Sequence, residues 1–240
     1  MSVIRTARER ARDEVTAAIK EEARRQLADE GASRLSLRAV ARELGMVSSA
    51  LYRYFPSRDE LLTALIVDAY DAVGAAAEEA LARAGGDEPV ERWREVCRAV
   101  RRWALGHPHE YALIYGSPVP GYSAPLDTIG PASRVPLALL AVAEQAHAAG
   151  ALAVPSPDEP LSDAAHADAW RLSKDLDRDL PPRAIPPLVA AWAQLFGLVS
   201  FEVFGQFNKV VEARDDFFDQ AVAGLAHQAG LRRERVLRGE

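Results

Sequence analysis

Apolar residues recur at helical spacing along most of this 240-residue chain. Leu37, Val40 and Leu44 lie three or four positions apart, and Leu51 and Phe55 lie four apart. This spacing places apolar side chains on one face of a helix, whereas a half-buried strand needs strict alternation. Clear alternating segments are missing from the sequence. The pattern predicts an all-α fold.

The same periodicity and the glycine and proline breaks between the apolar runs predict the remaining elements. We expect a helix over 58–83, a second from Pro89 to the His107-Pro108 boundary, and a short helix carrying Tyr111 and Tyr115. The residue that precedes a proline is disfavoured in the helical conformation, so a helix boundary is expected at His107-Pro108. The Pro- and Gly-rich segment 117–136 predicts a long irregular loop, and long loops in compact domains are often functional. The later elements are a helix to about 149, a turn-rich stretch over 150–160, a partly helical segment over 163–179, a helix after Pro186-Pro187 and a last helix over about 215–229.

Residues 36–58 combine two short helices with a tight turn between them. Ser36 stands where an N-cap is needed, and Gly45 stands where the first helix must stop. The second helix is predicted over about 48–54, followed by a capping box between Ser57 and Glu60. This arrangement is typical of a helix-turn-helix, which places its second helix in the DNA major groove.

The outer face of the predicted second helix suits DNA. Leu51 and Phe55 are expected to point inward. Small side chains let a backbone approach base edges, while hydroxyl and guanidinium groups reach phosphates and bases. The alternative is an ordinary helical hairpin with exposed tyrosines. The residues expected to face outward are Ser48, Ser49, Ala50, Tyr52, Arg53 and Tyr54.

The first sixty-odd residues resemble the N-terminal domain of the TetR family of bacterial transcription regulators. Two departures from the family pattern are Val47, at a position that is often polar, and Tyr54, which replaces the usual histidine. Val47 cannot cap a helix with its side chain, so Ser48 is the expected cap. The residues that carry the resemblance are Ile19, Ala23, Leu27, Gly31, Leu35, Ser36, Val40, Ala41, Gly45, Leu51, Tyr52, Arg53, Phe55, Ser57 and Arg58.

The resemblance implies a role for each residue of the motif. For Ala50 the alternative is packing, and for Arg58 it is a solvated surface charge. Ser36 and Arg38 would contact phosphates, Val47, Ser48, Ser49 and Ala50 would approach base edges, and Tyr52, Arg53, Tyr54 and Arg58 would grip the DNA backbone.

The resemblance also implies an organisation and a mechanism. A three-helix DNA-binding domain would occupy residues 1–60, and a larger helical domain for ligand binding and dimerisation would occupy 61–240. The chain would act as a repressor that binds a palindromic double-stranded DNA operator as a homodimer. A small organic effector would release it.

The charge distribution agrees with a DNA-binding N-terminal part. The net charge is −6, but residues 1–62 hold 12 Lys+Arg against 10 Asp+Glu, a net of +2. The acidic excess therefore lies outside this part. Arginines at 5, 8, 10 and 12 make the N-terminus locally basic, as in arms that follow DNA, although a solvated terminus has the same composition.

Aromatic residues from Trp103 onward suggest a pocket for a small organic ligand, because such pockets have apolar walls and few polar groups. Trp103, His107 and Gly116 also resemble a Trp-His-Gly signature of some TetR-type C-terminal domains. For each aromatic the alternative is core packing, and Glu202 would bind a ligand group, bind an arginine or face a dimer seam. The ligand candidates are Trp103, His107, Tyr111, Tyr115, Tyr122, Trp192, Phe196 and Glu202.

The last two predicted helices are candidates for a dimer interface. The segment 188–205 is apolar on more than one side, which indicates burial nearly all round. With the last helix it would form half of a four-helix bundle across a two-fold axis, as the resemblance also implies. A fully intramolecular core is the alternative.

Signals for other functions are weak in this sequence. His107-Pro108-His109-Glu110 lacks the spacing of a zinc protease, and neither a nucleophile elbow nor a P-loop occurs. We expect no catalytic residues, no metal and no cofactor. The rival class is an all-α enzyme or small-molecule carrier with an incidental helix-turn-helix.

The sequence also predicts a cytoplasmic protein without a membrane partner. Cys97 is the single cysteine, which suits a reducing compartment, and it is expected to be a buried apolar residue. The N-terminus is polar and charged, unlike a signal peptide. The most apolar run, 188–205, is of marginal length for a membrane span.

Overall fold

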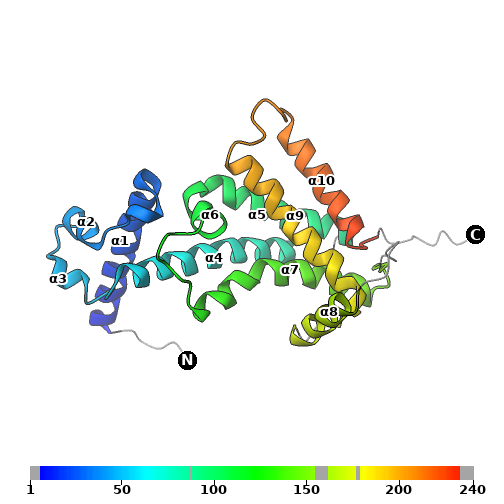
Figure 1. Cartoon of the computed structure of the whole chain (residues 1–240), viewed down its shortest axis with the longest axis horizontal. Helices are drawn as coiled ribbons and strands as arrows, with labels where there is room; N and C mark the ends of the chain where they lie inside the picture. Colours follow the sequence, from blue (N-terminus) through cyan, green and yellow to red (C-terminus); the bar gives the residue numbers. More distant parts are fainter. Residues whose placement is uncertain (1–5, 87, 155–161, 177–178, 233–240) are drawn as a thin grey trace, which may run out of the picture. The chain divides into compact units, whose positions relative to one another are not determined.

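The computed structural model describes residues 6–86, 88–154, 162–176 and 179–232, and it confirms the all-α prediction (Figure 1). Extended structure in these ranges is limited to an isolated bridge between Leu152 and Leu231. The α-helices are α1 (Ala7–Glu30), α2 (Leu37–Glu43), α3 (Ser48–Leu51), α4 (Arg58–Arg83), α5 (Pro89–Gly106), α6 (Pro108–Tyr115), α7 (Ile129–Ala148), α8 (Asp163–Asp175), α9 (Ile185–Val203) and α10 (Arg214–Gln228). Short 3₁₀ turns are η1 (Ala32–Arg34), η2 (Leu126–Thr128) and η3 (Pro182–Ala184).

The chain forms two compact units. The first unit contains the described residues up to Ala72 together with His107–Ala132, and the second contains Val73–Gly106 and the described residues from Ser133 onward. Helix α4 contributes its first half to the first unit and its second half to the second. The functional division at residue 60 stays a prediction, because compactness does not say which residues bind DNA.

The first unit is built on one apolar core that α1, α2, α3 and the start of α4 share. Ile19, Val40, Leu51 and Leu62 are fully buried in it. Ile19, Ala23 and Leu27 lie four apart and form an apolar stripe on α1, so this otherwise charged helix has one buried face. The core holds the two short helices of residues 36–55 in place.

The segment after α5 also belongs to the first unit. Arg24 of α1 forms ion pairs with Asp68 of α4 at 2.8 Å and with Glu110 of α6 at 3.3 Å. The Thr63 and Tyr122 hydroxyls share a hydrogen bond of 2.9 Å. Because these contacts join α6 and the following loop to α1 and α4, the segment is part of the same packed body.

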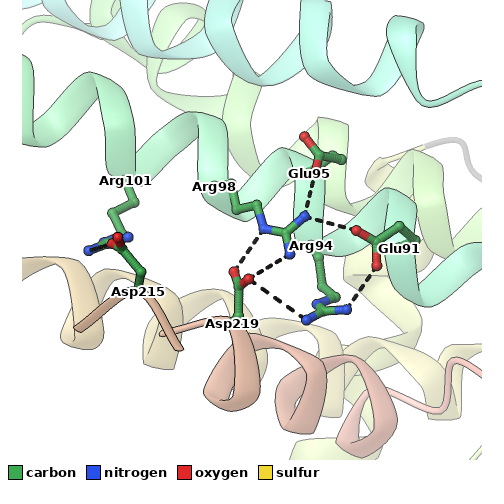
Figure 2. A network of polar contacts seen from close by, with 7 residues as sticks. All are labelled: Glu91, Arg94, Glu95, Arg98, Arg101, Asp215 and Asp219. Atoms are coloured by element: carbon green, nitrogen blue, oxygen red, sulfur yellow. Dashed lines mark hydrogen bonds and ion pairs between the residues drawn. The ribbon is translucent and has the colours of Figure 1, made fainter. Parts of the chain in front are cut away.

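The second unit is held by polar contacts around its apolar core. Arg98 of α5 donates two hydrogen bonds to Asp219 of α10, at 2.7 and 2.6 Å, and it also contacts Glu91 and Glu95 of its own helix (Figure 2). Arg94 approaches the same Asp219 carboxylate at 3.8 Å. These bonds fix α10 along α5, and they lower the pKa of Asp219 because the arginines stabilise its charged form.

Glu202 of α9 binds an arginine, which was one of three alternatives. Its carboxylate accepts two hydrogen bonds of 2.7 Å from Arg101 of α5, and the two side chains are only 6% and 13% exposed. Arg101 also pairs with the exposed Asp215 of α10 at 2.8 Å and stacks over the Phe218 ring. One guanidinium therefore joins α5, α9 and α10.

The prediction that 117–136 is irregular is wrong for its last residues, 129–136. Helix α7 already begins at Ile129 and contains Pro136 in its interior. Pro131 falls in the first turn, where a missing N–H has no consequence. Interior proline removes a backbone hydrogen bond, yet α7 continues past Pro136 with Ala138, Leu139 and Val142 buried. The boundaries of α4, α5 and α10 lie within one residue of the predicted ones.

Candidate DNA-binding surface

The turn between α2 and α3 has the geometry that the sequence predicts. The Ser36 hydroxyl accepts a hydrogen bond of 3.4 Å from the Ala39 amide, so Ser36 is the N-cap of α2. Gly45 has a φ of +65°, a conformation that favours glycine. The Met46 and Gly45 amides donate to Ala41 and Arg42 carbonyls at 2.8 and 3.1 Å. This is a Schellman motif, which closes α2 rigidly before α3 begins.

Helix α3 is shorter than predicted, covering Ser48–Leu51 instead of about 48–54. The chain continues as tight turns, in which the Tyr54 amide donates to the Leu51 carbonyl at 2.8 Å. Phe55 precedes Pro56, and this position disfavours further helix. The expectation that Ser48 caps the helix is wrong, because Val47 occupies the N-cap position and makes no side-chain cap bond.

The outer surface of α3 is open to solvent. Leu51 and Phe55 are buried, as predicted, while Val47 is 70% and Tyr52 41% exposed. Ser48, Ser49 and Arg53 are exposed as well. We call residues 47–53 the recognition strip. It offers one apolar side chain, two hydroxyls, a phenol and a guanidinium on a support held from behind by core residues.

Two residues expected to face outward are only half-exposed. Ala50 is half-buried, which agrees with its alternative role in packing. Tyr54 packs partly against the core, and the Arg12 guanidinium of α1 lies over its ring at 5.2 Å. This cation–π contact fixes Tyr54 to α1, a link that sequence reasoning missed because it joins residues 42 positions apart.

Arg58 is anchored within the first unit. Its guanidinium donates to the Leu35, Ala32 and Ser33 carbonyls at 3.1, 2.8 and 3.3 Å. These bonds hold the turn before α2, whose cap is Ser36. A DNA contact by Arg58 stays a prediction, but the structure gives the side chain a positioning role that neither sequence alternative included.

Gln26 is a second positioning residue that sequence reasoning missed. It is buried, and its amide oxygen accepts a hydrogen bond of 3.4 Å from the Ser36 amide. The available signal was a polar residue on the apolar stripe of α1 with Ile19 and Ala23, since buried polar groups need partners. Arg38, on the exposed side of α2, is open to solvent beside this cap.

Comparison with known proteins agrees with this geometry. Residues 19–65 match the family model described as bacterial regulatory proteins of the tetR family, and residues 93–225 match the tetracyclin repressor-like C-terminal domain. Over 203 residues the chain is 42% identical to the HTH-type transcriptional regulators Rv1816 of Mycobacterium tuberculosis and Mb1846 of Mycobacterium bovis. The alignment covers 82% of this chain and 84% of each relative. The chain belongs to the TetR family. It is therefore a DNA-binding transcriptional regulator, and this assignment places it outside the enzyme class.

Solved structures show the same fold. The crystal structure of the regulatory protein SCO4313 superposes with a TM-score of 0.74 at 37% identity, covering 92% of this chain and all of that chain. The TetR family regulator PfmR from Thermus thermophilus has a TM-score of 0.54 at 19% identity, covering 90% and 99% of the two chains, which supports the fold alone.

The predicted ligand residues of this TetR-family regulator divide between its two units. His107, Tyr111, Tyr115 and Tyr122 lie in the first unit. There Tyr111 is fully buried, its ring lies 5.1 Å from Tyr115, and burial raises the pKa of Tyr115. His107 is exposed at the start of α6. These contacts favour core packing for the buried Tyr111 and the half-buried Tyr115.

The other four candidates, Trp103, Trp192, Phe196 and Glu202, lie in the second unit. Trp103 and Phe196 are buried, and Glu202 is occupied by its arginine. Trp192 meets the Phe196 ring edge-on at 6.3 Å and lines an apolar cavity. It is the one predicted ligand residue that lines this cavity in the described part of the chain.

The Trp-His-Gly resemblance stays a prediction, although two of its residues have a clear local role. His107 and Gly116 bound α6 on either side. A Cβ added at Gly116 would lie 2.3 Å from the Ala112 carbonyl oxygen, so only glycine fits there. Among the described residues no group of three metal-ligating side chains comes together.

Two helical stretches of the regulator, Leu126–Ala148 and Pro182–Val203, are long and apolar enough to cross a membrane by length and composition. This finding covers the described residues alone. The core helices of soluble proteins pass the same test. TetR-family regulators are soluble, and both stretches fit core helices of that kind.

Proposed function

We propose that this TetR-family regulator is a cytoplasmic repressor that binds a palindromic operator as a homodimer and leaves it when a small organic molecule binds. The observation that carries the DNA part is the recognition strip, exposed on a rigid turn. Two strips related by a two-fold axis would enter major grooves about one helical turn apart, or a multiple of it.

Exposed apolar residues support dimerisation through α9 and α10. Phe201 is 53%, Phe204 45% and Phe217 37% exposed. Phe207 links two of them, with ring centroids 5.7 Å from Phe201 and 5.4 Å from Phe217. A cluster of exposed aromatic rings is typical of a protein interface. Because α9 and α10 are already fixed to α5, the same two helices of a second copy would complete a four-helix bundle.

Close packing of α4 and α7 supports ligand control. Arg134 of α7 donates two hydrogen bonds of 2.8 and 2.6 Å to Glu78 of α4, and its side chain lies against Gly74. Helix α4 begins directly after the helix-turn-helix, at Arg58. A ligand that moves α7 would therefore act on α4. It would lower DNA affinity by its preference for the state that cannot bind DNA.

The DNA part is tested by selecting duplexes from a random library with the full chain and measuring their affinity by fluorescence anisotropy. An inverted repeat is expected, together with a steep loss of affinity as salt rises. Arg53→Ala should weaken binding and lower the salt slope by about 1, because it removes one phosphate contact.

The matched control is Arg83→Ala, which removes an exposed arginine of the second unit that is paired with Glu79. It should leave DNA affinity nearly unchanged. Equal effects of the two variants, or selected sequences without two-fold symmetry, would contradict the proposal. When the operator is placed over a promoter, adding the regulator should reduce transcription in vitro. Increased transcription on addition of the regulator would reject the repressor assignment.

The dimer is tested by light scattering after size-exclusion chromatography. Phe201→Arg should convert the dimer to a monomer, since a charge would be buried in the apolar seam. Leu126→Arg is the control, because Leu126 is 81% exposed and lies outside α9 and α10. A monomeric unmodified chain, or a dimer that tolerates Phe201→Arg, would exclude this interface.

A further inference from the structure

The second unit contains an apolar cavity of about 200 Å³ between α7, α8 and α9. Its walls include Leu140 of α7, Leu172 of α8 and Leu188 of α9. Nine of its eleven lining residues are aliphatic or proline, and no described lining residue is charged. The two exceptions, Ser133 and Trp192, are neutral. The walls therefore favour an uncharged guest, because an ion placed here loses hydration without gaining a counter-charge.

The size of the cavity limits the guest. An engineered apolar cavity of about 150 Å³ binds benzene. A cavity of about 200 Å³ therefore suits roughly eight to ten non-hydrogen atoms. Pockets for drug-sized ligands are larger, about 300–1,000 Å³. The volume points to a medium-length alkyl or single-ring compound.

Among the described residues that line the cavity, Trp192 has a buried polar atom without a hydrogen-bond partner. Its indole N–H is buried and has no acceptor within the described part of the chain. Leaving such a donor unpaired has a substantial cost, and a ligand oxygen would remove that cost. Trp192 lines the cavity, so a hydroxyl or carbonyl group on the guest is the matching chemistry.

We propose that this cavity binds a small uncharged hydrophobic molecule with one hydrogen-bond acceptor for the Trp192 indole. The inference rests on the proposed function, for which it names the class of effector. One wall is α7 at Ser133, Pro136 and Leu140. Pro136 lacks the N–H of a regular helix, and the neighbouring Arg134 holds α4 through Glu78. A guest that displaces this part of α7 acts on the α4 contact.

The test is calorimetric titration of the full chain with 1-octanol, octanoate and n-octylammonium, which share an eight-carbon chain and differ in charge. Octanol should bind with one molecule per chain and at least tenfold more tightly than either ion. Equal or tighter binding of octanoate or octylammonium would overturn the proposal.

Two cavity-filling variants locate the binding site. Leu188→Phe should weaken octanol binding at least tenfold, and Leu172→Phe, on the partly exposed α8, provides a second variant if the first does not fold. Leu126→Phe is the control at an exposed position. Unchanged octanol affinity in a folded Leu188→Phe or Leu172→Phe protein would place the binding elsewhere and reject the cavity.

The hydrogen bond is tested separately by Trp192→Phe, which should reduce octanol affinity roughly two- to tenfold. Trp170→Phe is the matched control, because Trp170 is 50% exposed and lies outside the cavity lining. Equal affinities of these two variants would reject the indole contact.

These measurements use no DNA, so they separate the two proposals. Operator binding without octanol binding would reject the cavity and leave the DNA-binding function in place. Octanol binding that leaves operator affinity unchanged would keep the cavity and reject its role in release.

Discussion

Replacing Arg101 by methionine should destabilise the regulator by about 3–5 kcal/mol, because it leaves the buried carboxylate of Glu202 without its counter-charge. The Glu202 side chain is 6% exposed, and its two hydrogen bonds both come from Arg101. No second partner for this carboxylate lies among the described residues. Methionine keeps the apolar contact with the Phe218 ring, so the loss measured is mainly electrostatic.

The reverse change should cost less. In Glu202→Leu the arginine retains Asp215, whose carboxylate lies 2.8 Å away and is 90% exposed. The loss is then about 1.5–3 kcal/mol, the range for a hydrogen bond to a charged group. The double variant Arg101→Met/Glu202→Leu replaces the pair by apolar side chains, which is often neutral or stabilising. Its stability should therefore exceed that of Arg101→Met alone.

The assay is urea unfolding followed by circular dichroism at several protein concentrations, since dimerisation makes apparent stability depend on concentration. The order of stability, from the highest, should be the unmodified chain and the double variant, then Glu202→Leu, then Arg101→Met. If Arg101→Met costs less than about 1 kcal/mol, or the double variant is the least stable, Glu202 is hydrated and the buried pair does not join these helices.

Three further outcomes are expected. Gly74→Ala should lower the free energy of unfolding by about 1 kcal/mol, measured by thermal or urea unfolding. Overpacking against Arg134 costs about 1–3 kcal/mol, which exceeds the gain in helix propensity of about 1 kcal/mol. A stabilised variant would contradict the close contact. The arginine partners of Asp219 lower its pKa in the folded state. Its contribution to folding stability is therefore complete above the ordinary carboxyl pKa of about 3.9, and it is lost as the pH falls through the lowered pKa of the folded state. Asp219→Asn should accordingly be less stable at neutral pH and equal to the unmodified chain in strong acid, and a difference independent of pH would refute the ion pair. Burial raises the pKa of Cys97, so a thiol reagent in mildly alkaline buffer should react with Cys97 only after unfolding. Prompt reaction of the folded chain would show that the thiol is accessible.

The local part of this structure could be predicted from sequence because its causes are local. The turn at Gly45 follows from a stop in the apolar stripe and from the low cost of left-handed backbone in glycine. The buried positions Leu51 and Phe55 follow from helical spacing. The length of α3 could not be predicted as well, since the apolar spacing continues to Phe55 while the backbone turns before Pro56.

The positions of the aromatic residues depend on long-range packing, which periodicity does not encode. Tyr111 and Tyr115 look like pocket residues in the sequence because they are apolar rings with one polar atom. The structure places them in the first unit, where α6 is tied to α1 through Arg24 and Glu110. A pairing between residues 86 positions apart has no signal in a single sequence. The cavity was missed for the same reason, since aliphatic residues from three helices form its walls.

Helix α4 connects the DNA-binding surface to the proposed effector site, and its buried face explains how. Leu61, Leu65 and Ala69 lie in the core of the first unit, and the same stripe continues through Val73 and Ala77 in the second. The apolar residues become smaller along the helix, and Gly74 lets the Arg134 side chain of α7 approach closely. Buried side chains therefore hold α4 within each unit separately. Under the proposed ligand control, a ligand that shifts α7 would either break the Arg134–Glu78 contact or displace the second-unit part of α4, and the proposal requires the second outcome.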